Sequence, residues 1–177
     1  MSPAPSKQVI EQIRKDLFST DEATLLQALS RCSADGNITL IEPLILLFFK
    51  SQEGQVREEA ADILRSIKVA NAEEPFMEAL LNPEYKVIRK DILSFIWNSG
   101  LQPVGWIADI TRIAVEGSLE EIIECLTLVE SMDDLFPEEQ VLDSVQLVRE
   151  YLNEAPMSEK SKLLAAFLGL LESLEQD

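Results

Sequence analysis

The chain has 177 residues, of which 46% are hydrophobic and 27% are charged, with 8 Pro and 6 Gly. This length and composition fit one ordinary globular domain and exclude disordered, collagen-like and disulfide-scaffold classes. The sequence contains no histidine, the commonest general base and metal ligand, and its formal charge is −17. We therefore expect no nucleic acid partner, because phosphate binding requires clustered Lys and Arg.

Apolar residues recur with the helical period of 3.6 along almost the whole chain, and no stretch shows sustained alternation of period two. We therefore predict ten helical segments. Their connections are short, as is typical of antiparallel helical neighbours. In chain order the predicted helices are 5–18, 20–34, 38–51, 54–69, 72–82, 84–98, 103–116, 118–133, 137–154 and 158–175.

Several predicted helices begin at recognisable start signals. In a capping box the cap oxygen accepts a bond from an unpaired N–H of the first turn, and an acid reaches back to the cap. Pro103 and Pro137 are predicted to be first helical residues, where proline lacks only a donor that is unpaired anyway. The pairs with capping-box spacing are Ser19 with Glu22, Asn71 with Glu74, and Ser118 with Glu121.

Two segments repeat the same signature at an offset of 32 residues. Each has a proline in its first helix and an aliphatic–arginine pair in its second. The two prolines lie inside predicted helices, so we expect each to remove a hydrogen bond and bend its helix. The signature residues are Pro43, Val56, Arg57 and Ala60 in the first copy, and Pro75, Ile88 and Arg89 in the second.

The segment Val56-Arg57-Glu58-Glu59-Ala60-Ala61-Asp62-Ile63-Leu64 resembles the second helix of a HEAT repeat, of the kind found in bacterial-type HEAT-like proteins. The resemblance is strong over 38–98 and weaker over the rest of the chain. It implies an α-solenoid in which the arginine contacts an acidic residue of the turn between paired helices. Glu53 and Glu84 are the only acidic candidates for that contact.

We therefore predict an all-α fold, a right-handed α-α superhelix (solenoid) of about five HEAT-like antiparallel helix pairs, forming a single domain over 1–177. An ordinary helix bundle is the alternative. Helix 38–51 favours the solenoid, because it is apolar nearly all round and needs cover on several sides. The predicted pairs are 5–34, 38–69, 72–98, 103–133 and 137–175.

Sequence motifs for catalysis are missing. Without histidine the usual triads and most zinc sites are excluded, and the singly scattered glycines form no phosphate-binding loop. We expect no catalytic residue, no cofactor, no metal and no enzymatic activity. Acids one turn apart, such as Glu58 and Asp62, could hold a cation, although we expect a solvated face. Cys32 and Cys125 could form a single disulfide, although we expect two free thiols that act as small apolar core residues.

Two enzymatic alternatives remain open. Trp97, Trp106, Asp109 and Arg112 are similar in type to residues with which HEAT-like DNA glycosylases act on alkylated bases, but those enzymes have a strongly basic groove. We expect both tryptophans to pack at junctions between repeats. A HEAT-like pigment lyase is the other alternative, and no particular residue favours it.

Acidic residues are concentrated towards the C-terminus. Residues 1–115 hold 16 acids and 12 bases, whereas residues 116–177 hold 16 acids and 3 bases. A surface of that charge attracts basic protein segments and repels nucleic acid and anionic membranes. The alternative is that the charge serves only solubility.

We therefore expect a non-catalytic protein-protein interaction scaffold or adaptor that recognises a basic partner segment. We further expect a monomer without membrane or nucleic acid partners. It is expected to be cytoplasmic, because its first residues lack a secretory signal pattern. The candidate partner-binding residues are Lys86, Arg89, Lys90, Arg112, Glu120, Glu121 and Glu124.

Overall fold

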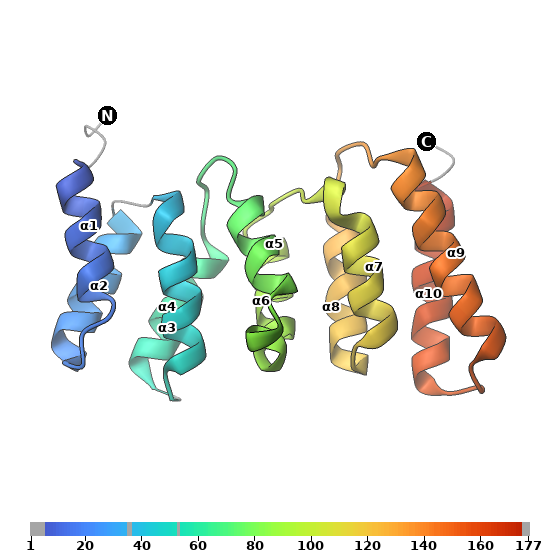
Figure 1. Cartoon of the computed structure of the whole chain (residues 1–177), viewed down its shortest axis with the longest axis horizontal. Coiled ribbons are helices and arrows are strands. Elements are labelled where there is room, and N and C mark those ends of the chain that lie inside the picture. Colours follow the sequence, from blue (N-terminus) through green and yellow to red (C-terminus); the bar gives the residue numbers. More distant parts are fainter. Residues whose placement is uncertain (1–5, 35–36, 53, 175–177) are drawn as a thin grey trace. The chain divides into compact units, whose positions relative to one another are not determined.

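The computed structural model describes residues 6–34, 37–52 and 54–174 (Figure 1). Every regular element in these ranges is a helix, which confirms the predicted all-α class. The chain forms two compact units, residues 1–88 and 89–177, so the third predicted pair, 72–98, is divided between them. A single domain over 1–177 stays a prediction.

The first unit is built from two layers of helices. Helix α1 packs on α2 and α3 packs on α4, while α2 also contacts α4 and α3 also contacts α5. Ile13, Leu29 and Ile45 lie in its core and are fully buried. The elements are α1 (Lys7–Asp16), α2 (Glu22–Ala34), η1 (Ile38–Leu40), α3 (Ile41–Lys50), α4 (Gln55–Arg65), α5 (Glu73–Leu81) and η2 (Pro83–Ile88).

The second unit repeats this arrangement. Helices α7 and α9 pack together in one layer, α8 contacts both α6 and α10 in the other, and α7–α8 and α9–α10 form hairpins (Figure 1). Phe95, Ile110 and Phe167 are fully buried between the layers. The elements are α6 (Arg89–Asn98), η3 (Val104–Trp106), α7 (Ile107–Glu116), α8 (Leu119–Glu130), α9 (Glu138–Glu154) and α10 (Glu159–Leu174).

Within each unit a helix thus packs on its hairpin partner and on the helix two places along the chain, as in an α-solenoid. Helix α3 shows why. Ile41, Leu44, Ile45 and Phe48 are buried, and this broad apolar surface is covered by α4 and α5 together. The expectation of cover on several sides is confirmed, while the right-handed sense and the HEAT assignment stay predictions.

The two repeated prolines do not act as expected. Pro43 and Pro75 are each the third residue of their α-helices, α3 and α5. N–H groups of the first turn have no acceptor within an α-helix, so a proline there removes no bond from the ladder. The predicted loss of a helical hydrogen bond is therefore wrong, and with it the reason for a bend.

Of the three predicted capping boxes, one is confirmed. The Ser118 hydroxyl accepts from the Glu121 N–H at 3.2 Å, and the Glu121 carboxylate accepts from the Ser118 N–H at 2.7 Å. At α2 the predicted cap, Ser19, is wrong, because Asp21 accepts from the Thr24 N–H at 2.9 Å and so caps the helix.

The remaining start signals are displaced or absent. Asn71 adopts a left-handed φ of 60°, and α5 begins after Ala72 without a side-chain cap, so the predicted box there is wrong. Pro103 and Pro137 each lie one residue before their helices, η3 and α9. Helix α4 ends at Arg65, well short of the predicted residue 69.

No helix in the described ranges is both long and apolar enough to cross a membrane. Both cysteines are buried and neither is in a disulfide, as expected. The Cys125 thiol points at the Ile110 carbonyl, with 3.6 Å between sulfur and oxygen, and its burial raises its pKa above the usual value.

We predict that Cys32 and Cys125 react with Ellman's reagent at pH 8 only when their unit unfolds, because the reagent cannot reach a buried thiol and because the raised pKa of Cys125 also keeps that thiol protonated. The measurement compares the reaction rate in buffer with that in guanidinium. A thiol that reacts in buffer as fast as a free cysteine would contradict the burial described above.

Candidate functional site

Five of the seven predicted partner-binding residues meet where α6 packs on α8. Arg89 and Lys90 begin α6, and Glu120, Glu121 and Glu124 lie in the first half of α8. The Lys90 ammonium donates to Glu120 at 3.1 Å, and this bond raises the pKa of Lys90. Sequence analysis found these residues but not that they partner one another.

Glu121 has two roles at this contact. One carboxylate oxygen closes the capping box of α8, and the other lies 3.5 Å from the Arg89 guanidinium. Both side chains of the ion pair are only 13% exposed, and the Arg89 Nε has no hydrogen-bond partner in the described part of the chain. The acid paired with Arg89 is therefore Glu121, where sequence analysis had proposed Glu84. Arg89 and Glu121 join α6 to α8.

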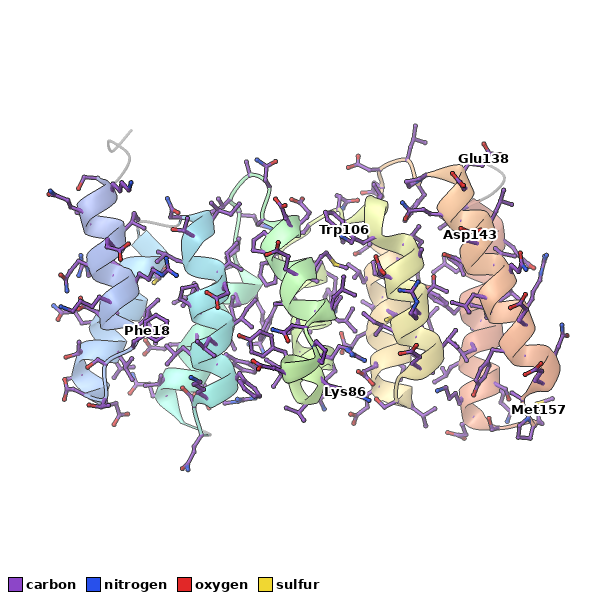
Figure 2. All side chains as sticks on the ribbon, in the orientation of Figure 1. Phe18, Lys86, Trp106, Glu138, Asp143 and Met157 are labelled. Carbon is purple, nitrogen blue, oxygen red and sulfur yellow. The ribbon has the colours of Figure 1, made fainter. Side chains whose placement is uncertain are left out.

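The four residues named for the glycosylase alternative do not form one site, and their interactions are with different parts of the unit. The Trp97 indole N–H donates to Glu124 of α8 at 2.8 Å, and Trp106 is half-buried in η3 (Figure 2). On α7, the Arg112 guanidinium donates to Asp109 at 2.9 Å. Trp97 thus serves the same α6–α8 contact.

Arg57 and Lys86 belong to the first unit. The Arg57 guanidinium donates to the carbonyls of Phe48 and Ser51 and lies 3.7 Å from the centre of the Phe48 ring, so it holds the turn between α3 and α4. The acidic partner proposed for it, Glu53, lies outside the described residues. Lys86 is exposed in η2 (Figure 2).

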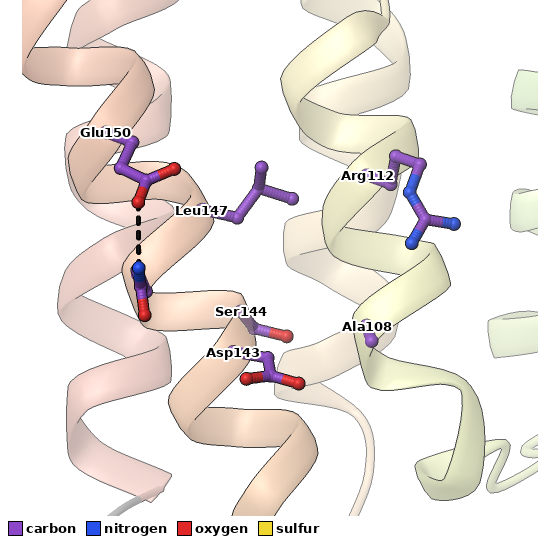
Figure 3. A pocket seen from close by; sticks show the side chains of 7 residues that line it. Ala108, Arg112, Asp143, Ser144, Leu147 and Glu150 are labelled. Atoms are coloured by element: carbon purple, nitrogen blue, oxygen red, sulfur yellow. Dashed lines mark hydrogen bonds between the residues drawn. The ribbon is translucent and has the colours of Figure 1, made fainter.

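A groove of about 360 Å³ runs between α7 and α9 of the second unit (Figure 3). Arg112 is its only residue that sequence analysis had singled out. The missed signal is the spacing of Asp143, Leu147 and Glu150, which places an acid, a leucine and a second acid along one side of α9. The lining residues are Ala108, Arg112, Asp143, Ser144, Gln146, Leu147 and Glu150.

The groove carries more negative than positive charge. Its one base, Arg112, is already paired with Asp109. Glu150 accepts only from the Gln146 amide, at 2.8 Å, and Asp143 has no ion pair or hydrogen bond to any described residue. Two carboxylates therefore face solvent along the groove without a base of their own.

The same imbalance holds across the second unit, which has 18 acidic and 6 basic residues. Four of its bases form ion pairs, and the Lys160 ammonium donates to the Gly117 carbonyl at 2.8 Å. Figure 2 shows two exposed acids, Glu138 and Asp143, on α9. The exposed acids without an ion pair to a described residue are Glu116, Glu130, Asp133, Asp134, Glu138, Glu139, Asp143, Glu150, Glu154 and Glu159.

Comparison of the chain with models of protein families, with curated proteins and with solved structures finds no match in any of the three. Within the described ranges, no group of three or more Asp, Glu or Cys residues is arranged to hold a metal ion.

We predict that Glu121→Gln lowers the free energy of unfolding by about 1–3 kcal/mol, because it leaves the largely buried Arg89 guanidinium without its counter-charge. Glutamine still closes a capping box, so the change isolates the ion pair. The matched control is Glu120→Gln, whose exposed pair with Lys90 contributes about 0–1 kcal/mol. Urea unfolding of both variants measures the difference, and equal losses would contradict the structural role assigned to Glu121.

Proposed function

We propose that this protein is a non-catalytic protein-protein interaction scaffold, and that its second unit binds a basic segment of a partner protein in the groove between α7 and α9. The observation that supports this most directly is the pair of groove carboxylates, Asp143 and Glu150, that lack a base of their own.

The lining of the groove suits a lysine or arginine side chain. Ala108 and Leu147 supply apolar surface on which the aliphatic part of such a side chain can pack, while its charged end reaches a carboxylate. Asp143 and Glu150 are two helical turns apart, about 10 Å along the axis of α9. In an extended segment, residues three apart are separated by a similar distance, about 10 Å. The preferred ligand therefore carries basic residues at every third position.

The charge of the whole unit assists such binding. A net charge of −12 over residues 89–177 accelerates the approach of a cationic segment and slows that of anionic molecules. Because exposed charges are screened by salt, this part of the affinity falls as ionic strength rises. The same charge opposes self-association, which supports a monomer.

The repeat signature at Pro43 and Pro75 and the packing of helices at every second position support a HEAT-like repeat architecture for this scaffold, for which we propose the right-handed sense. Two buried free thiols, Cys32 and Cys125, accord with a reducing compartment such as the cytoplasm.

We predict that the double variant Asp143→Asn with Glu150→Gln weakens binding of a short extended peptide, with lysine at every third position and serine between, by about tenfold at low salt. Fluorescence anisotropy of the labelled peptide measures the dissociation constant.

The control variant removes the same charge elsewhere on the unit, through Asp134→Asn with Glu159→Gln. It should retain most of the affinity, because these exposed acids lie outside the groove. Equal weakening by both variants would show that net charge alone attracts the peptide and would refute the groove as the site.

A further inference from the structure

Helix α8 presents apolar residues to solvent at the edge of its buried face. Ile122, Cys125 and Leu128 are fully buried against the rest of the unit. Leu119 and Ile123, one helical turn apart, are 38% and 49% exposed. Both side chains thus stay partly open to solvent although α8 packs against α6, α7 and α10.

The neighbouring helix α10 has small exposed side chains, so its surface is shallow there. The bond from Lys160 to the Gly117 carbonyl sets the N-terminus of α10 next to that of α8. The two helices follow successive hairpins and run in the same direction, so Ala166, six residues after Lys160, and Ile123, six residues after Gly117, both lie about 9 Å beyond this bond along their helices.

The small side chains of α10 are not required by the fold. Ala165, Ala166 and Gly169 are exposed, and a Cβ added at Gly169 would meet nothing within 4 Å. A glycine inside a helix weakens it, and no neighbour within the unit accounts for this one. Space is therefore open over Gly169, on the helix that neighbours α8, for the side chain of another molecule.

The surroundings of these residues are acidic. Glu120 and Glu130 are exposed on α8, Glu116 is exposed at the end of α7 just before it, and Lys90 of α6 is already bonded to Glu120. On α10 the exposed base is Lys162. A second copy of this chain, itself strongly negative, would be repelled from this surface, and so would an anionic membrane. A cationic molecule would be attracted.

We propose that the α8 face, defined by Leu119, Ile123, Ala166 and Gly169, is a docking surface for an amphipathic helix of a partner protein. The docked helix places apolar residues, spaced three and four apart, on Leu119 and Ile123, and its flanking lysines or arginines meet the carboxylates around them. This surface is distinct from the α7–α9 groove, because the two belong to opposite helix layers of the unit.

The test uses a labelled peptide designed as a cationic amphipathic helix, with one leucine stripe and lysines elsewhere. Its affinity for the full chain is measured by fluorescence anisotropy at low and high salt. The variant Leu119→Gln with Ile123→Gln should weaken binding at least about tenfold at both salt concentrations, because apolar contact is not screened. Both positions are exposed, and circular dichroism verifies that the variant stays folded.

The matched control is Leu135→Gln with Leu142→Gln, which removes two other exposed leucines of the same unit, 85% and 51% exposed, and should leave the affinity unchanged. Equal weakening by both variants, or no weakening by the first, would overturn the α8 face as a docking surface. The groove variant Asp143→Asn with Glu150→Gln should retain high-salt binding of this peptide, so failure of either proposal is recognised separately. If sedimentation shows a dimer and Ile123→Gln converts it to a monomer, the α8 face binds a second copy of this chain. That result would also overturn the proposal.

Discussion

Short helices impose the main constraint on this fold. Most of its α-helices have only nine to thirteen residues, and helices of that length are marginal in water unless an apolar face is buried by tertiary packing. One neighbour does not suffice for α3, whose buried residues reach both α4 and α5. In the second unit α8 is likewise packed by α6, α7 and α10. Each helix is therefore stable only as a member of its stack. The residues on its outward side are not needed for this packing and can bind other molecules.

This constraint separates charges that serve the fold from charges that remain available. Arg89 and Glu121 are largely buried and join two helices, so a binding role cannot be assigned to them from charge alone. Asp143 lies on an outward side and has no base among the described residues. The acidic excess of the second unit consists largely of residues like Asp143, and for this reason the proposed binding surfaces are located there rather than at the α6–α8 contact.

The sequence predicted the fold class and most helix positions, because apolar periodicity reports directly which side of a helix is buried. It also identified the Ser118–Glu121 capping box, a local motif that needs no tertiary information. It failed at Asn71, where the chain turns through a left-handed residue before α5 begins, and at Pro43, whose position within its helix decides whether a bond is lost.

The candidate site was harder to predict, since its residues come from helices that only packing brings together. The acid that pairs with Arg89 is more than thirty positions away, on α8, and no local pattern marks Glu121 as that partner. The α7–α9 groove depends likewise on which residues of α7 face Asp143 and Glu150. The decisive experiment is amide hydrogen exchange of the full chain, with and without the lysine peptide at low salt. Peptide bound in the groove is expected to slow exchange in α7 and α9. Protection confined to the first unit, or no protection despite binding, would contradict it.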